Sequence, residues 1–171
     1  MRTILRTERL LLREFVIADS PFIVSLLNSA DWLRFIGDRN VRTNDDAKNY
    51  LREGPFASYK LHGFGLWAVS RLTDNALIGM CGLLKRDYLE HPDIGFAFLS
   101  DYQGKGFGFE AAKATLSYAS GELNLPCISA ITSKNNERSI GLLKILGFQF
   151  IEMIHIEKKD ELMLFKTCFE H

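Results

Sequence analysis

The sequence predicts an α/β fold of three layers, in which helices cover both faces of a mixed seven-stranded sheet. Two observations support this class. Short runs with strand-like apolar patterning outnumber the stretches with helical spacing of apolar residues. In the second half of the chain, strands alternate with helices that can serve as crossovers between parallel strands. The predicted order, β-α-α-β-β-β-α-β-α-β-β, is not that of a doubly wound sheet.

The N-terminal part of the chain is predicted to form one strand followed by helices. Residues Leu10–Phe15 (LLLREF) have the pattern of a strand. Asp19 is a candidate N-cap, with Pro21 in the first turn of the helix that follows. Residues Asp31–Ile36 form a second short helical segment, which Gly37 ends.

A capping box marks the start of the next helix. Thr43 precedes Asp46 by three residues, so each side chain is expected to bond the backbone of the other. The helix is expected to run through Leu51 and to break near Gly54–Pro55, with another helical turn before Gly63.

The middle of the chain is expected to form three strands. Residues Phe64–Arg71 and Ala76–Lys85 flank the turn signal Thr73–Asn75, which predicts a β-hairpin. The third strand, Asp93–Leu99, follows a turn at His91–Pro92.

The last third alternates helices and strands. The predicted elements are a helix whose apolar face begins at Phe109, the strand Cys127–Thr132, the helix Asn136–Leu146 closed by Gly147, and the strands Phe148–Ile156 and Leu162–Phe169. The charged segment Glu157–Glu161 is expected to be the solvated tip of the last hairpin.

Composition and charge predict one domain over residues 1–171. The fractions of 47% hydrophobic and 25% charged residues are ordinary for a compact domain, and this length is enough for a substantial core. Lys plus Arg and Asp plus Glu each total 21, so the formal net charge is zero. A zero balance argues against a nucleic-acid partner, which requires a cationic face, and against a basic helix on a membrane.

The cysteines and the N-terminus predict a cytoplasmic protein. Cys81, Cys127 and Cys168 are odd in number, far apart and in apolar stretches, so we expect buried free thiols in a reducing compartment. Neither the cysteines nor the histidines have the spacing of a metal site. Residues 1–6 lack the apolar core of a signal peptide, and no apolar run approaches the roughly 20 residues of a membrane span.

The segment Gln103–Gly108 (QGKGFG) carries the clearest chemical signal. It joins a predicted strand to a predicted helix, and its glycines allow a ligand to approach the backbone amides closely. The free N–H groups and the positive dipole end of the helix add to an anion site suited to a pyrophosphate. A flexible loop is the alternative. Two common phosphate motifs are excluded, because G-x-G-x-x-G requires glycine at Phe109 and the P-loop requires Ser or Thr at Gly106.

In its context, this turn resembles the signature of the GNAT acetyltransferases. The matching pattern is Gln103-x-x-Gly106-x-Gly108. Other blocks that resemble the family follow the same order along the chain: the opening Thr7–Arg13 (TERLLLR), the strand Asp93–Leu99 (DIGFAFL), and Asn136-x-x-Ser139 followed by Leu146-Gly147-Phe148. The opening resembles the Rim-type branch, named for enzymes that acetylate ribosomal-protein N-termini. The motif-bearing region spans residues 8–168.

The resemblance implies the GNAT fold and acetyl transfer from acetyl-CoA to an amine, without a covalent enzyme intermediate and without a metal. It assigns the pyrophosphate to the backbone of Gln103, Gly104, Lys105, Gly106, Phe107 and Gly108. The pantetheine arm is expected beside Ala97, Phe98 and Leu99, where the family's sheet splays apart, with the N–H of Phe98 polarising the thioester carbonyl. Asn136 is expected to contact the cofactor arm or to order the chain beside it.

The candidate catalytic side chains are Asp93 and Ser139. Asp93 occupies the position of a frequent family Glu and is a candidate base, acting directly or through water, while a capping or solubilising role is the alternative. The family's Tyr acid, seven residues after the motif Asn, is Leu143 here, which leaves Ser139 as the nearest polar candidate acid. The alternatives to Ser139 as acid are a helix Ser bonded to backbone and a thiolate released to solvent or protonated through water.

The sequence does not identify the acceptor, which can be a protein N-terminal amine, a polyamine-like molecule, or an amino-sugar or antibiotic amine. Five aromatic residues near the expected acceptor groove either shape its pocket or pack in the core: Trp32, Phe35, Tyr50, Phe64 and Trp67. The expected partners are acetyl-CoA and this amine, with no nucleic acid and no membrane, and a homodimer stays open. The alternative function is a non-catalytic acyl-CoA-binding sensor on the same fold.

Overall fold

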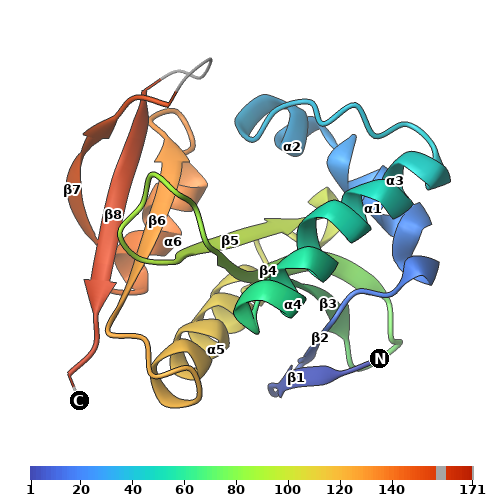
Figure 1. Cartoon of the computed structure of the whole chain (residues 1–171), viewed down its shortest axis with the longest axis horizontal. Helices are drawn as coiled ribbons and strands as arrows, with labels where there is room; N and C mark the ends of the chain where they lie inside the picture. Colours follow the sequence, from blue (N-terminus) through green and yellow to red (C-terminus); the bar gives the residue numbers. More distant parts are fainter. Residues whose placement is uncertain (157–160, 171) are drawn as a thin grey trace.

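A computed structural model of the chain describes residues 1–156 and 161–170. Its centre is an eight-stranded sheet in the order β1-β2-β3-β4-β5-β6-β8-β7 (Figure 1). The strands are β1 (Thr3–Arg6), β2 (Leu10–Arg13), β3 (Leu66–Arg71), β4 (Leu77–Leu84), β5 (Asp93–Phe98), β6 (Cys127–Ser133), β7 (Gln149–Ile154) and β8 (Leu162–Cys168). Neighbouring strands are antiparallel except for β5 and β6, which are parallel.

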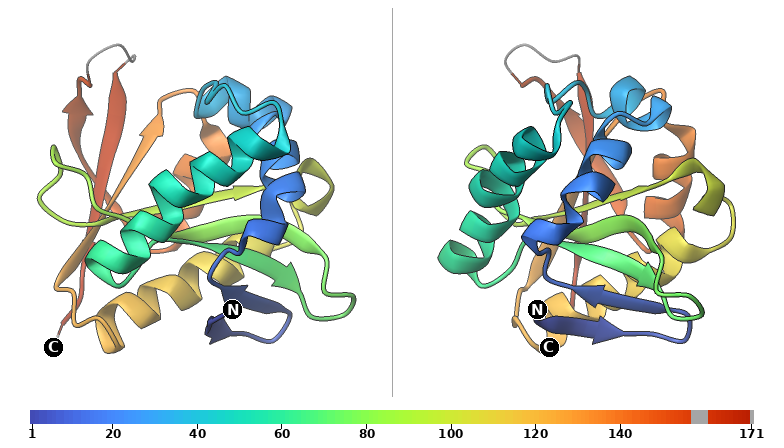
Figure 2. Two further views of the ribbon diagram at one scale, coloured as in Figure 1. Left: turned by 45° about the vertical axis from the view of Figure 1, so that its right-hand side comes forward. Right: turned by 90° about the vertical axis from the view of Figure 1, so that its right-hand side faces the viewer.

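Helices lie on both faces of the sheet, which confirms the predicted three layers (Figure 2). One face carries α1 (Ser20–Leu27), α2 (Ala30–Phe35), α3 (Asn44–Leu51) and α4 (Ala57–His62), and the other carries α5 (Phe107–Gly121) and α6 (Glu137–Ile145). Two buried apolar clusters fill the spaces between the layers. In β3, Trp67 and Val69 belong to the cluster beneath α5, whereas Ala68 belongs to the cluster beneath α1 and α3. This alternation follows from the period of two along a strand.

The described sheet has eight strands, one more than predicted, and the additional strand is β1. This strand pairs with β2 at the edge of the sheet, and its four residues are at most half-buried. The strand has four residues, Arg2 precedes it and Arg6 is its last residue. So short a segment lacks the alternation of apolar and polar residues that predicts a strand from sequence.

As predicted, α3 ends at Leu51 and a further short helix precedes Gly63, but the chain does not leave the helical conformation at Gly54–Pro55. The chain continues from α3 through a π-helical turn at Arg52–Phe56 into α4, which ends at Gly63 in the left-handed region (φ +76°). The wider turn accommodates a proline that has no N–H to donate. The hydroxyl of Tyr59 ties α4 to the sheet, because it accepts from the N–H of Phe15 (3.2 Å) and donates to the carbonyl of Leu66.

The two predicted caps at helix N-termini have different outcomes. The capping box is confirmed, with Asp46 N–H donating to Thr43 Oγ1 (3.1 Å) and Thr43 N–H donating to Asp46 Oδ2 (2.9 Å). Asp19 precedes α1 but makes no side-chain cap. Its carboxylate is held instead by the buried guanidinium of Arg13 (2.8 and 2.9 Å) and by the N–H of Val16 (2.8 Å).

The cysteine prediction is wrong for two of the three residues. Cys127 and Cys168 lie opposite each other on β6 and β8 and form a disulfide across a sequence separation of 41 residues. The pairing of these two strands, which the spacing in sequence does not reveal, brings the sulfur atoms together. Cys81 is a buried free thiol as expected, and burial raises its pKa to about 12. The argument from free thiols to a reducing compartment therefore does not apply to Cys127 and Cys168.

Two further predictions concern the last hairpin and membrane-spanning segments. Most of the segment Glu157–Glu161, the predicted hairpin tip, lies outside the described residues. Across the part of the chain that the structure describes, no helix is both long and apolar enough to span a bilayer.

Removing the disulfide is expected to destabilise the protein. The bond closes a loop of about 40 residues, so Cys168→Ser should lower the free energy of unfolding by about 2–4 kcal/mol in denaturant titrations. A thiol reductant should lower the wild-type midpoint in the same way and leave the variant unchanged. Equal midpoints for the oxidised wild type and Cys168→Ser would contradict the pairing.

Candidate functional site

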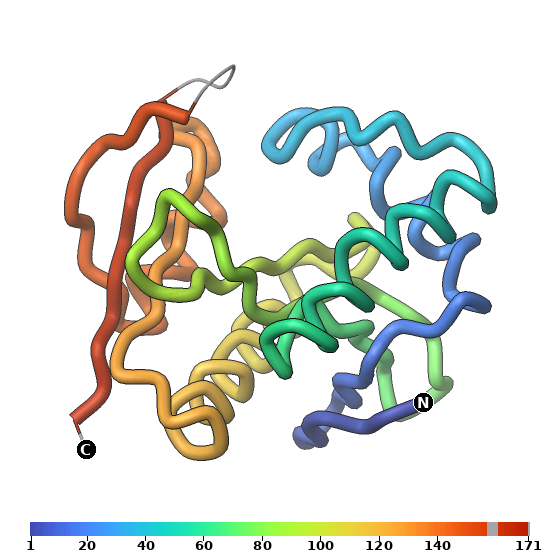
Figure 3. The backbone as a smooth tube through the Cα atoms, in the orientation of Figure 1, coloured from blue at the N-terminus to red at the C-terminus, as the bar shows by residue number. Residues whose placement is uncertain are grey.

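A cleft of about 1070 Å³ opens where the sheet divides between β5 and β6. The two strands pair at one position, Asp93 opposite Ser129, where the N–H of Ser129 donates to the carbonyl of Pro92 (2.9 Å). Beyond it the two backbones diverge (Figure 3). The rest of β5 lines the cleft, with β6 and α6 on one side and α2, α3 and α4 on the other.

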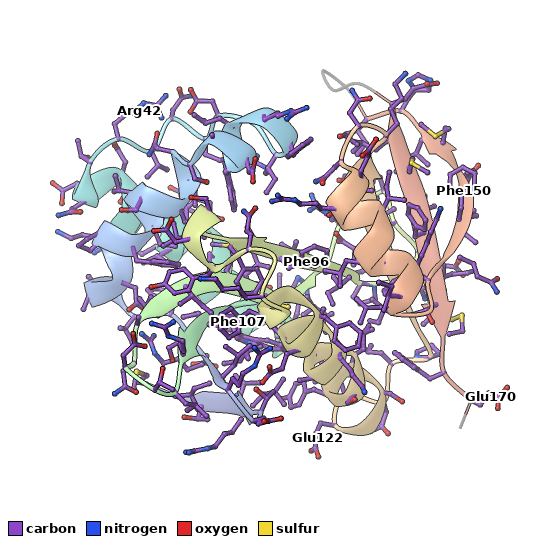
Figure 4. All side chains as sticks on the ribbon, turned by 180° about the vertical axis from the view of Figure 1, so that it is seen from behind. Arg42, Phe96, Phe107, Glu122, Phe150 and Glu170 are labelled. Carbon is purple, nitrogen blue, oxygen red and sulfur yellow. A yellow bond between two sulfur atoms is a disulfide. The ribbon has the colours of Figure 1, made fainter. Side chains whose placement is uncertain are left out.

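The backbone of β5 presents free polar groups to this cleft. The N–H of Leu99 donates to the carbonyl of Ile78 on β4 (2.9 Å). Because successive residues of a strand direct their amides to opposite sides, the N–H of Ala97 also faces β4, whereas those of Phe96 and Phe98 face the cleft. Figure 4 labels Phe96 between the two halves of the molecule. The carbonyl of Phe98 on that side accepts from Nε2 of Gln103 (2.9 Å).

Gln103 joins three parts of the site. Besides its bond to Phe98, it accepts from the guanidinium of Arg138, which lies in the first turn of α6. The side chain therefore connects the glycine turn, the end of β5 and the helix across the cleft. Its partner Arg138, 35 residues away, was missed by the sequence analysis.

The glycine turn has the backbone conformation expected of an anion site. Gly104 (φ +71°) and Gly106 (φ +82°) are in the left-handed region, which favours glycine, and Gly106 is the N-cap of α5. Gly104 and Gly108 line the cleft together with Gln103. Lys105 is exposed beside the ring of Tyr102 (5.9 Å) and belongs, like Gly106, to the surface of the turn.

The side chain of Phe107 does not belong to the cleft. It is buried in the core beneath the first turn of α5, so only its backbone is available to a ligand. At Gly108, a Cβ would lie 3.6 Å from Leu142 and 3.7 Å from Phe98, which are ordinary van der Waals contacts, so packing alone does not require glycine there.

Asp93 is a buried carboxyl at the point where the sheet divides. It is 1% exposed, and Nε of Arg86 donates to both of its oxygens (3.0 and 3.2 Å). Burial raises the pKa of Asp93 to about 6, although the charge and hydrogen bond of Arg86 partly oppose this shift. Both residues line the cleft. Arg86 follows β4 in an irregular segment, and the sequence analysis did not identify it.

The α6 side of the cleft contains Asn136 and Ser139. Asn136 caps the helix, since its Oδ1 accepts from the N–H of Ser139 (3.2 Å), and it also lines the cleft. Ser139 lines the cleft in the first turn of α6. Leu143, at the position of the absent tyrosine, is a buried core residue.

The opposite side of the cleft is partly aromatic. Trp32, Phe35 and Tyr50 line it, whereas Phe64 and Trp67 lie in the core beneath α5. Burial raises the pKa of Tyr50, although the charges of Arg39 and Arg86 oppose the shift. Tyr50 is therefore a neutral phenol in the same cleft as the Arg86–Asp93 pair. The sequence did not show whether Tyr50 lines the cleft or packs in the core.

A family model described as "Acetyltransferase (GNAT) domain" matches residues 9–149 of the chain. The chain belongs to the GNAT acetyltransferase family. The fold and the divided sheet described above are those of a GNAT domain, so the predicted fold class is confirmed. GNAT acetyltransferases use acetyl-CoA.

Known relatives agree with this assignment to the GNAT family. The uncharacterised N-acetyltransferase YnaD of Bacillus subtilis (strain 168) is 31% identical over 144 residues, covering 84% of this chain and 81% of YnaD. An acetyltransferase of Agrobacterium tumefaciens str. C58 superposes with a TM-score of 0.82 at 22% identity, covering 98% and 94% of the two chains. RimL, an L7/L12 α-N-protein acetyltransferase solved with coenzyme A, gives 0.80 at 12% identity, covering 98% of each chain. The two structures establish the likeness of fold.

The ionisation of Asp93 can be measured without a substrate. Carboxyl ¹³C NMR should give a pKa of about 6, and Arg86→Met should raise it further, because the variant loses the cation that opposes protonation. Lys85→Met is the matched control, since Lys85 instead donates to the carbonyl of Leu89 (3.3 Å). A wild-type value near 4, ordinary for Asp, would contradict the effect of burial.

Proposed function

We propose that this GNAT domain is an acetyl-CoA-dependent N-acetyltransferase that transfers an acetyl group directly to a primary amine. The observation that carries the proposal is the end of β5–β6 pairing at Asp93. It leaves the N–H of Phe98 facing a cleft that has the glycine turn at one end of β5 and the buried carboxyl of Asp93 at the other. These are three requirements of the reaction: an electrophile-activating dipole, an anion site and a proton acceptor.

Acetyl-CoA is proposed to lie along β5 and over the glycine turn. Its diphosphate would accept from the amides of residues 103–108, aided by the positive end of α5. Its pantetheine arm would run beside Ala97, Phe98 and Leu99 in place of the missing strand. Asn136, which already orders the start of α6, would stand beside this arm.

The transfer step forms one bond and breaks another. The neutral amine attacks the thioester carbonyl, whose oxygen is stabilised by the N–H of Phe98. The C–N bond forms, the C–S bond breaks, and the electron pair leaves with the sulfur of CoA. Asp93 takes the amine proton, directly or through water, and Ser139 is the proposed proton donor to the thiolate, with its own hydroxyl proton replaced from water.

The acceptor is proposed to be an N-terminal amine of a protein or a small-molecule amine. Support for a Rim-type acceptor comes from the TERLLLR opening and from the fold shared with RimL. The aromatic side of the cleft, with Trp32, Phe35 and Tyr50, would contact the acceptor.

The test is an assay of CoA thiol release across a panel of amines. The panel contains N-terminal peptides, spermidine and aminoglycosides, with acetyl-CoA as donor. Release with one class of amine supports the enzyme. Stabilisation by acetyl-CoA in thermal unfolding with no release from any amine would favour the sensor, and no stabilisation at millimolar acetyl-CoA would refute both functions.

A charged side chain at the glycine turn should abolish cofactor binding. Gly106→Glu adds a negative charge to the proposed diphosphate turn and strains a residue with φ +82°, whose Cβ would also lie 3.2 Å from Nη2 of Arg9, so calorimetry should show an affinity for CoA that is weaker by about 100-fold. Gly121→Glu adds the same charge at the far end of α5, where a Cβ meets no atom within 4 Å, and should bind normally. Unchanged affinity of Gly106→Glu would contradict the diphosphate site.

The pH profile tests Asp93 as the base. Because only the ionised carboxylate accepts a proton, kcat/KM of the wild type should rise with pH through about 6, separately from the rise at higher pH that comes from deprotonation of the amine itself. Asp93→Asn should be slower by roughly 10²–10⁴-fold and should lack this rise. Ser139→Ala provides the comparison, since loss of an acid should lower the rate and leave the rise in place. An Asp93→Asn variant that keeps the rise would refute the assignment.

A further inference from the structure

Arg9, in the TERLLLR opening, contacts the glycine turn from the side away from the cleft. Its Nη1 donates to the carbonyl of Lys105 (3.0 Å), and its guanidinium lies over the ring of Phe107, 4.5 Å from the centroid. Figure 4 labels Phe107 at the start of α5. A segment at the N-terminus thus contacts a turn that lies 96 residues further along the chain.

Arg9 is itself fixed by Glu110 in the first turn of α5. The carboxylate of Glu110 accepts from Nε of Arg9 (2.7 Å), from the backbone N–H of Arg9 (2.8 Å) and from the hydroxyl of Thr7 (2.6 Å). Although burial acts to raise it, these hydrogen bonds hold the pKa of Glu110 below its usual value. The carboxylate is therefore ionised at neutral pH, and its partner is the guanidinium of Arg9.

The bond to Lys105 determines where the next amide points. In a trans peptide the carbonyl and the following N–H point in opposite directions. Because the Lys105 carbonyl is turned towards Arg9, the N–H of Gly106 is turned away from it. The absence of a side chain at Gly106 permits this packing, since a Cβ there would lie 3.2 Å from Nη2 of Arg9.

Charge leads to the same conclusion. An ionised Glu110 in the first turn of α5 repels an anion at that helix end, and an inward-facing Lys105 carbonyl would do the same. Arg9 neutralises the first and turns away the second. One side chain thereby removes two sources of repulsion from the turn.

We infer that Arg9 is a positioning residue, which orients the Lys105–Gly106 peptide and offsets Glu110 so that the turn binds the diphosphate of CoA. The inference rests on the proposed function. Thr7 and Glu110 hold the guanidinium in place, which gives the T-x-R pattern of the opening a role in cofactor binding. Lysine cannot replace it fully, because an ammonium lacks the planar fork that reaches both the Lys105 carbonyl and Glu110.

The experiment compares a ligand that contains the diphosphate with one that lacks it. Calorimetry gives the Kd of CoA, and displacement of CoA gives that of pantetheine, for wild type, Arg9→Met, Arg9→Lys and Arg6→Met. Arg6 is an exposed cation on the same hairpin and serves as the charge-matched control. Arg9→Met is expected to weaken CoA about ten-fold and leave pantetheine within two-fold of wild type, with Arg9→Lys intermediate and Arg6→Met near wild type.

Other results overturn the inference. Equal losses for CoA and pantetheine would make Arg9 a general support of the fold, and unchanged CoA affinity in Arg9→Met would show that the turn does not need it. A wild type that binds no CoA would refute the proposed function and the inference together. If the wild type binds CoA and Arg9→Met binds it equally well, the inference is refuted and the proposed function stands.

Discussion

The division of the sheet after Asp93 is the constraint on which the site depends. Parallel pairing of β5 and β6 lasts for one position, and every feature of the cleft follows from its end. The amides of Phe96 and Phe98 lose a neighbouring strand on one side, α6 moves away from β5, and a space opens between the two halves of the sheet. Backbone groups that would complete a sheet elsewhere are here available to a ligand.

Side chains from distant segments hold this opening in shape. Arg86 pairs with the buried carboxyl of Asp93 at the closed end of the cleft. Gln103 connects the open end of β5 to α6 through Arg138. Buried charge is tolerated at the closed end because the ion pair is hydrogen-bonded, although burial still shifts Asp93 towards its neutral form. The same environment that disfavours the charge gives the carboxyl a pKa suited to proton transfer near neutrality.

Sequence patterns predicted the local features of this protein and missed the distant pairings. The glycine turn, the capping box of Thr43 and Asp46, and the strand Asp93–Leu99 are encoded by residues close together in the chain. Arg9 with Glu110, Arg86 with Asp93, and Cys127 with Cys168 depend on how strands and turns meet in the fold. Strand β1 and the π-helical turn at Pro55 were missed for another reason, since tertiary contacts stabilise short elements whose own patterns are weak.

The pairing of Arg9 with Glu110 has a consequence for solution conditions. With its guanidinium committed to a carboxylate, Arg9 adds no net charge to the turn and contributes to the proposed diphosphate site through the orientation of a peptide dipole at a helix end. Mobile ions screen attraction between net charges far more than they screen hydrogen bonds at contact distance. The contribution of Arg9 to cofactor affinity should therefore vary little with ionic strength, in contrast to lysines and arginines that contact phosphates directly.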